Sequence, residues 1–287
     1  MNTKTKPKVI AIAAPTASGK TSYAIELAKE IRGEIVSADS RIIYKGFDIA
    51  CAKPTKKEMQ DIKHYIIDIV EPEIDYSVAN YVDDATFAIN EILSKNKTPI
   101  IVGGTGLYFR ALLEGWDLPR VEPNYELREQ LEQLAIEELL EKLKTLDEKT
   151  YTQMNKEPKK RKIIRAIEVC KSLGEPMSNI SNQKEKPYEV EWIGIGMTRD
   201  ELYERVNKRV DLMVEQGVVE ETKHLLEKHG RIKNLISTIG YNEIIQYLDN
   251  EITLDRAIEL IKQHSRNYAK RQLTWFRKNA NLDYKDS

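Results

Sequence analysis

The residues with the clearest chemical potential lie near the start of the chain, in the segment 9–21, VIAIAAPTASGKT. An apolar, β-branched run leads into a short Thr/Ser/Gly stretch, and Lys20 and Thr21 then open an amphipathic segment. Loop N–H groups and the positive end of a following helix bind phosphate, lysine adds a charge, and the Thr21 hydroxyl can ligate Mg²⁺. The predicted diphosphate contacts from this loop are Thr16, Ala17, Ser18, Gly19, Lys20 and Thr21.

The loop departs at one position from the pattern G-x-x-x-x-G-K-[ST], because Ala14 stands where the first glycine is expected. Alanine fits there only with a negative φ, so we predict a slightly different entry turn. A Ser/Gly-rich turn that opens an ordinary helix is the structural alternative. The motif predicts phosphate binding and does not identify the molecule that carries the phosphate.

The composition limits the classes of protein to which the chain can belong. The 287 residues, 41% hydrophobic and 32% charged, fit a globular protein of one large or two modest domains. The net charge of −1 hides two basic stretches, 156–171 with seven basic residues against two acidic ones, and 262–278 with six basic residues and no acidic one. Two distant cysteines, and the absence of a signal peptide or a long apolar run, favour a reducing cytoplasm.

Strand-like runs at 9–13, 34–38, 64–70 and 99–102 alternate with helical segments at 20–32 and 78–95. We therefore expect an α/β fold, a P-loop NTPase-like parallel sheet flanked by helices. After Pro119 the pattern becomes helical and charge-rich (125–149, 161–173), then a polar loop (174–190), a strand (192–197) and helices (200–216, 218–229, 237–249, 253–279). The predicted domains are a core at 1–118 and 188–287 and a helical insertion at 119–187.

Ligands of a parallel sheet gather at the carboxyl ends of its strands. Three such ends carry conspicuous residues here: the phosphate loop, Asp39-Ser40-Arg41, and the glycine-rich stretch Gly103-Gly104-Thr105-Gly106. The sequence therefore predicts one site assembled from these three segments.

Four stretches go beyond a generic phosphate binder: 39–54 (DSRIIYKGFDIACAKP), 103–108 (GGTGLY), 239–243 (IGYNE) and 266–277 (RNYAKRQLTWFR). Together with the phosphate loop, and in this order, they resemble the tRNA isopentenyltransferase (tRNA dimethylallyltransferase) family over nearly the whole chain. The chain departs from the family pattern at Ala14, at Ala50-Cys51 where Gly-Thr is usual, and at Pro158-Lys159 where Asn-Asp is common. The resemblance implies transfer of the dimethylallyl group from dimethylallyl diphosphate to N6 of the adenosine 3′ to a tRNA anticodon, with Mg²⁺.

The implied reaction needs a base and a cationic site for the leaving group. An adenine amine is a poor nucleophile, and a nearby carboxylate can accept its proton, so Asp39 is the predicted base; a helix cap or Mg²⁺ ligand is its alternative role. Diphosphate departs with negative charge, which Lys20, the loop amides and two arginines four residues apart, Arg205 and Arg209, are expected to stabilise. The resemblance favours Arg209, and surface salt bridges are the alternative for the pair.

Thr105 is the third predicted catalytic residue. Its hydroxyl is interpreted as a partner of the adenine and diphosphate, with an N-cap for a helix at 106–114 as the structural alternative. RNA recognition uses basic residues on the backbone and stacking on splayed bases. The predicted tRNA contacts are Asp39, Ser40, Arg41, Thr105, Arg128, Arg161, Lys162, Arg165, Gly240, Tyr241, Lys270, Arg271 and Gln272. Trp275 and Phe276 are expected to pack the last helix onto the core.

Three other functions fit parts of the pattern. A nucleotide or metabolite kinase would use the same loop for ATP, and a prenyltransferase acting on free AMP would leave the basic helices unexplained. A non-catalytic RNA-binding protein would bind tRNA without any chemistry. We expect a cytoplasmic enzyme and a monomer.

Overall fold

The computed structural model describes residues 5–116, 119–180, 185–279 and 283–286. The chain divides into two compact units, Met1–Leu113 with Pro187–Ser287, and Glu114–Lys186. Residues 117–118, at the boundary expected from the sequence, and 181–184, in the predicted polar loop, lie outside the described residues. Within the described part of the chain, no helix is long and apolar enough to cross a membrane.

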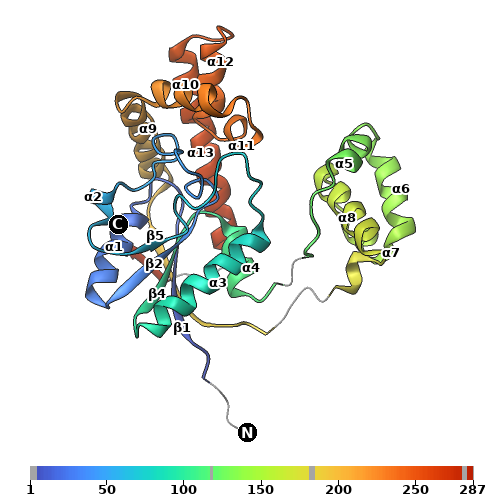
Figure 1. Ribbon diagram of the computed structural model, residues 1–287, viewed down its shortest axis with the longest axis horizontal. Coiled ribbons are helices and arrows are strands. Elements are labelled where there is room, and N and C mark those ends of the chain that lie inside the picture. Colours follow the sequence, from blue (N-terminus) through green and yellow to red (C-terminus); the bar gives the residue numbers. More distant parts are fainter. Residues whose placement is uncertain (1–4, 117–118, 181–184, 280–282, 287) are drawn as a thin grey trace. The chain divides into compact units, whose positions relative to one another are not determined.

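The first unit contains a sheet of six parallel strands in the order β3-β2-β4-β1-β5-β6 (Figure 1). The strands are β1 (Lys8–Ala13), β2 (Gly33–Ala38), β3 (His64–Tyr65), β4 (Thr98–Gly103), β5 (Glu189–Gly196) and β6 (Asp283–Asp286). The predicted α/β class with a parallel sheet is confirmed. Since β1, β2 and β4 are neighbours in the sheet, their carboxyl ends bring the three conspicuous loops to one edge.

Two strands differ from the prediction. β3 covers two residues and not the seven of 64–70, because Ile66 and Asp68 have positive φ values of 63° and 55° that interrupt the extended backbone. Strand β6, which pairs with β5 at the edge of the sheet, is not among the predicted strands.

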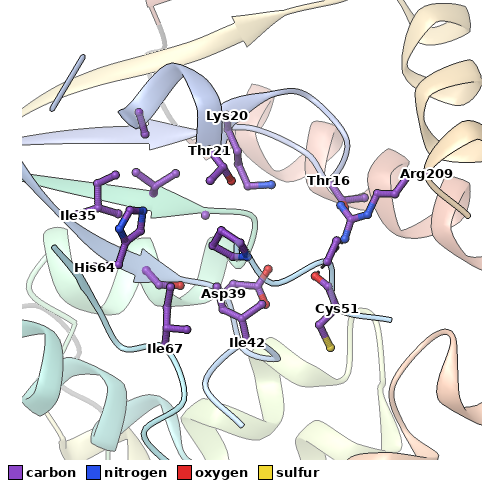
Figure 2. Close-up of a pocket in the computed structure, with 16 residues that line it drawn as sticks. Thr16, Lys20, Thr21, Ile35, Asp39, Ile42, Cys51, His64, Ile67 and Arg209 are labelled. Atoms are coloured by element: carbon purple, nitrogen blue, oxygen red, sulfur yellow. Dashed lines mark hydrogen bonds between the residues drawn. The ribbon is translucent and has the colours of Figure 1, made fainter. Parts of the chain in front are cut away.

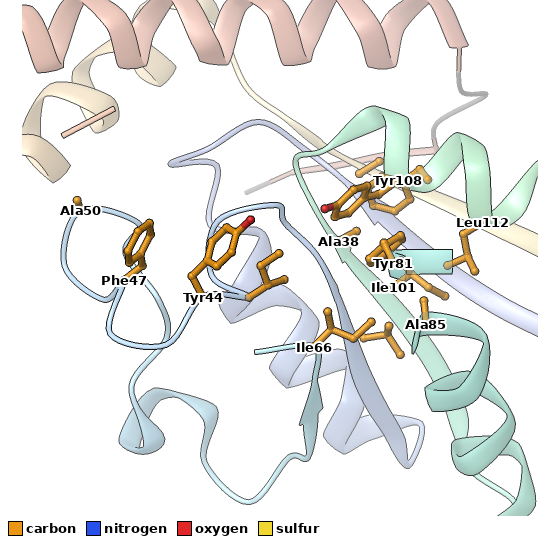
Figure 3. Close-up of a cluster of buried hydrophobic side chains, with 14 of the residues drawn as sticks. Ala38, Tyr44, Phe47, Ala50, Ile66, Tyr81, Ala85, Ile101, Tyr108 and Leu112 are labelled. Carbon is orange, nitrogen blue, oxygen red and sulfur yellow. The ribbon is translucent and has the colours of Figure 1, made fainter. Parts of the chain in front are cut away.

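Apolar side chains cover both faces of the sheet. Helix α1 (Lys20–Glu30) packs its buried Ala24 and Ile25 against Ile35 and Val102 on one face. The opposite face carries the larger cluster, in which Tyr81 of α3 (Val78–Ser94) and Leu112 of α4 (Gly106–Leu113) join Ala38 of β2 and Ile101 of β4 (Figure 3). Because strand residues alternate between faces, Ile35 and Ser37 of β2 face α1, while Val36 and Ala38 face the larger cluster.

The C-terminal part of the first unit is helical between β5 and β6, as predicted. It contains α9 (Arg199–Glu215), α10 (Val218–His229), α11 (Lys233–Ile236), α12 (Tyr241–Leu248) and α13 (Leu254–Asn279), and α2 (Lys56–Met59) lies earlier in the chain. The helix predicted from residue 237 begins at Tyr241 because Gly240 has a φ of 102°, which a helix cannot include. Phe276 is buried in the core of the unit, which confirms its expected packing role.

The second unit is a bundle of α5 (Tyr125–Glu132), α6 (Ile136–Leu146), α7 (Glu148–Met154) and α8 (Lys160–Leu173), followed by the 3₁₀ turn Met177–Asn179. The single helix predicted at 125–149 is broken twice. At the first break Ala135 is extended, and its N–H donates to the Glu138 carboxylate at the start of α6. At the second break the Asp147 carboxylate accepts a hydrogen bond from the Thr150 N–H at the start of α7. Leucine and isoleucine side chains of α5, α6 and α8 form its core.

Candidate active site

The phosphate loop connects β1 to α1. Gly19, with a φ of 82°, and Ala17, with a φ of 63°, take the left-handed conformation. Ala14 is not among the described residues with positive φ, which agrees with the prediction for this position. The ammonium of Lys20 donates to the Pro15 carbonyl at 3.2 Å, so the lysine side chain folds back over its own loop.

A glutamine of α13 fastens this loop to the neighbouring glycine-rich turn. The Thr16 N–H donates to Gln272 Oε1 at 2.9 Å, and Gln272 Nε2 donates to the Gly104 carbonyl at 2.9 Å. The approach is so close that a Cβ on Gly104 would lie 2.0 Å from Gln272 Nε2. Gln272 is buried at 5% exposure. Both ends of its amide are thus used inside the protein in this conformation, and the predicted tRNA contact by Gln272 stays a prediction.

A pocket lies beside the loop and holds about 570 Å³ of space, part of which is open solvent. Figure 2 shows Asp39 near its centre, with Thr16 and Arg209 to one side and Ile35 and His64 to the other. The lining has a polar group and an apolar group of side chains. The polar group is Thr16, Lys20, Thr21, Asp39 and Arg209, and the apolar group is Ala24, Ile35, Ile42, Pro54, Ile67 and Val102. The remaining lining residues are Ser37, Cys51, Ala52, His64 and Gly103. The structure thus brings together the predicted base, loop residues and arginine.

Asp39 follows directly after β2. One of its two carboxylate oxygens accepts a hydrogen bond from the Arg41 N–H at 2.8 Å. The Arg41 guanidinium donates to the carbonyls of Asn234 and Ser237, so this residue joins the base to the turn before α12. Asp39 is thus held by a hydrogen bond within its own loop, and Arg41 ties this loop to the segment 234–237.

Two cations lie near Asp39. Desolvation lowers the pKa of Lys20 to about 8, against the opposing effect of the Asp39 carboxylate. Desolvation also lowers the pKa of Arg209, which Asp39 again opposes. Arg209 donates to the Thr16 hydroxyl and, at 3.1 Å, to the Cys51 carbonyl. Partly desolvated cations gain most when an anion arrives, so the arrangement favours a polyanionic ligand.

Arg205 lies one helical turn before Arg209 on α9. Its Nη1 atom is 3.8 Å from the position that a Cβ on Gly19 would occupy, so the guanidinium reaches the phosphate loop from outside. Both predicted arginines therefore border the loop, Arg209 within the pocket lining and Arg205 on the exposed side.

Thr105 connects the glycine-rich turn to the loop that carries the base. Its hydroxyl accepts a hydrogen bond from the Ser40 N–H at 3.2 Å, and its own N–H donates to the Ala38 carbonyl at 3.1 Å. Burial raises the pKa of Tyr268 to about 12, and hydrogen bonds with the Thr105 and Gln272 side chains partly offset that shift. Thr105 thus has a hydrogen-bonding role beside Asp39. Sequence reasoning missed Tyr268, although it lies inside the 266–277 motif.

A half-buried carboxylate supports the loop whose Cys51 carbonyl accepts a hydrogen bond from Arg209. Glu221 of α10 accepts hydrogen bonds from the N–H groups of Ile49 and Ala50 and from the Tyr241 hydroxyl at 2.7 Å. Tyr241 is fully buried and packs edge-on against Phe47. The Tyr241 side chain therefore packs inside the protein in this conformation, and the predicted RNA contact by Tyr241 stays a prediction. Gly240 is also buried, and a Cβ there would lie 2.8 Å from that of Ala50, so the motif serves to pack α12 against this loop.

The basic residues of the second unit divide into two groups. Arg128 and Arg165 both bind the buried Glu168 carboxylate, and Arg165 also donates to the Val121 carbonyl. Arg161 and Lys162 are exposed at the start of α8. Lys270 and Arg271 on α13 of the first unit are exposed as well. Arg271 also lies over the Tyr268 ring, with its guanidinium carbon 5.7 Å from the ring centroid.

Comparison with known proteins agrees with this geometry. The sequence model described as "IPP transferase" matches residues 42–279. The chain is 43% identical to the tRNA dimethylallyltransferase of Halothermothrix orenii, over 96% of this chain and 86% of that protein, and 42% identical to that of Thermomicrobium roseum, over 99% and 87%.

Solved structures give the same result. The tRNA isopentenylpyrophosphate transferase of Bacillus halodurans superposes with a TM-score of 0.73 at 40% identity, over 98% of this chain and 90% of that one. A eukaryotic dimethylallyltransferase acting on tRNA gives a TM-score of 0.82 at 25% identity, over 98% and 74%. The phosphate loop, the Asp39 loop and the cationic pocket are thus set in a fold shared with these enzymes, and the chain belongs to the IPP transferase family.

Proposed function

We propose that this protein is a tRNA dimethylallyltransferase that alkylates N6 of the adenosine 3′ to the anticodon, with dimethylallyl diphosphate as donor. The observation that carries the proposal is the two-sided pocket around Asp39. One side holds Lys20, Thr16 and Arg209, and the other is mainly apolar. A donor with a charged diphosphate and a short hydrocarbon tail matches this division of polarity.

Different residues bind the diphosphate, accept the proton and position the base. The loop amides, Lys20 and the two arginines of α9 bind the diphosphate and stabilise the charge that develops as the allylic C–O bond breaks. Asp39 accepts the proton from the adenine amine as the N–C bond forms. Thr105 holds the Ser40 backbone next to this base. The target adenosine must leave its stack to reach a pocket of this kind.

Mg²⁺ fits the residues that line the pocket. The ion prefers oxygen ligands and is usually held by one or two protein oxygens, substrate phosphates and water. Thr21 and Asp39 supply such oxygens in one pocket, and no cluster of three or more metal-ligating side chains occurs in the described ranges. Thr21 would hold the ion, which neutralises the leaving diphosphate when bound.

The exposed basic residues of α8 and α13 are the proposed contacts to the tRNA backbone. Arg161, Lys162, Lys270 and Arg271 supply the charge that phosphate binding needs. We place the enzyme in the cytoplasm, where tRNA is the substrate. A monomer stays a prediction, which light scattering of the purified protein would test.

The test is a transfer assay with labelled dimethylallyl diphosphate, Mg²⁺ and an anticodon stem-loop that contains consecutive adenosines. Label should enter the RNA, and Asp39→Asn should abolish transfer while stem-loop binding persists. Parallel incubations with AMP, and with ATP and candidate acceptors, test the two other enzymes. Label in AMP alone would indicate a prenyltransferase acting on free AMP, and ATP turnover without RNA would indicate a kinase. RNA binding without any transfer would indicate a non-catalytic protein.

A further inference from the structure

The apolar side of the pocket contains two polar atoms that the proposed reaction does not use. Ser37 and His64 both line the pocket. Ser37 is 3% exposed, and its Oγ atom and the Nε2 atom of His64 are buried without a hydrogen-bond partner among the described residues. Buried polar atoms in native proteins are nearly always paired, so two in one pocket indicate a ligand group that pairs with them.

The sheet places both side chains on the same side. In the parallel pairing of β2 with β3, Ile35 is the partner of His64, and Ser37 is two residues further along β2. Side chains two apart on a strand share a face, and partners in neighbouring strands do as well. This is the face covered by Ala24 of α1. Figure 2 shows His64 beside Ile35, on the side of the pocket away from Arg209.

The hydrogen bond at His64 Nδ1 determines whether the Nε2 atom donates or accepts. Nδ1 lies 2.9 Å from the Ile62 carbonyl, which can only accept, so Nδ1 carries the proton and Nε2 is an acceptor. Burial lowers the pKa of His64 and favours this neutral form. Ser37 Oγ can donate or accept. The pair therefore suits a neutral group that both donates and accepts, which describes a hydroxyl and not a charged group.

We infer that the pocket also accepts a hydroxylated donor, an allylic diphosphate whose tail carries a hydroxyl on a terminal methyl carbon. The inference rests on the proposed function, because it assigns the tail to the apolar side. In the transfer the bond between the allylic carbon and the diphosphate oxygen breaks, the diphosphate leaves with the electron pair, and the carbon bonds to adenine N6. The N6 proton passes to Asp39, and the tail hydroxyl is unchanged in the product.

The experiment compares two donors, dimethylallyl diphosphate and its derivative hydroxylated on a terminal methyl, with the same stem-loop and Mg²⁺. The measured quantity is the ratio of kcat/KM for the hydroxylated donor to kcat/KM for the plain one, from mass spectrometry of the modified nucleosides. Ser37→Ala removes one hydroxyl partner. His64→Asn keeps a donor for the Ile62 carbonyl and removes the Nε2 acceptor. Ile67→Val is the matched control, since it trims an apolar residue of the same lining.

A wild-type ratio above one tenth, lowered about tenfold by Ser37→Ala and by His64→Asn and unchanged by Ile67→Val, supports the inference. A wild-type ratio below one tenth overturns it, as does an equal effect of either polar variant on both donors, which would assign the pair to an ordered water. The wild-type ratio needs no variant, so a failure of either variant to fold leaves the test decisive. If neither donor is transferred, the proposed function itself fails.

Discussion

Replacing Gln272 by leucine separates a structural role for this residue from an RNA-binding one. The side chain accepts from the Thr16 N–H and donates to the Gly104 carbonyl, both at 2.9 Å, in a site that is 5% exposed. Leucine has a similar volume and no polar atom, so both backbone groups lose their partner. A buried polar group without a partner costs about 1–3 kcal/mol, and the two together cost about 2–6 kcal/mol.

The same substitution should loosen the phosphate loop at Thr16, next to the hydroxyl that Arg209 contacts. We expect the midpoint of urea unfolding to fall, and the KM for dimethylallyl diphosphate to rise at least about fivefold, which corresponds to roughly 1 kcal/mol. The dissociation constant for the stem-loop should change less than about twofold.

The assay is urea unfolding followed by circular dichroism, together with donor kinetics and stem-loop binding by fluorescence anisotropy. Arg271→Ala is the matched control, because Arg271 is the exposed neighbour on the same helix and should weaken only stem-loop binding. Gln272→Glu keeps an acceptor for Thr16 and serves if the leucine variant does not fold. Weaker stem-loop binding by the leucine variant, with unchanged stability and donor KM, would refute the reasoning.

Three further predictions concern other parts of the site and the second unit. Because the pKa of Lys20 is lowered to about 8, its charge is present below that pH and is lost above it, so donor affinity measured by calorimetry should fall above pH 8 and should stay level in Lys20→Arg. Gly103→Ala should lower the free energy of unfolding by about 3 kcal/mol and abolish transfer, because the new Cβ would lie 2.1 Å from the Ala38 carbonyl oxygen, next to Asp39. Unfolding and transfer like those of the wild type would contradict this prediction. Arg161→Ala combined with Lys162→Ala should reduce the slope of log affinity for the stem-loop against log salt concentration by about 1.4. Arg165→Ala should instead lower the thermal stability of the second unit, because it removes a partner of the buried Glu168. An unchanged slope in the double variant would exclude α8 from the RNA-binding surface.

The sequence alone determined the order of the strands and helices around the phosphate loop and the chemistry of the short motifs. The phosphate loop between β1 and α1 follows from local physics, since the glycine, lysine and threonine at 19–21 act through their own backbone and side chains. The parallel sheet follows from the alternation of strand-like and helical segments. Asp39 could be selected because the carboxyl ends of parallel strands meet at one edge.

Only the tertiary structure decided which polar residues face the ligand and which hold the protein together. Gln272 lies in a motif rich in basic residues, and Tyr241 lies beside the polar Asn242 and Glu243. Nothing in their local sequence distinguishes a buried amide or phenol from an exposed one. Their partners, Thr16 and Glu221, are 256 and 20 residues away. Arg128 and Arg165 likewise meet Glu168 only after the second unit folds. Burial and long-range hydrogen bonding depend on the packing of distant segments, so a pattern in the sequence predicts the groups available and the fold determines their tasks.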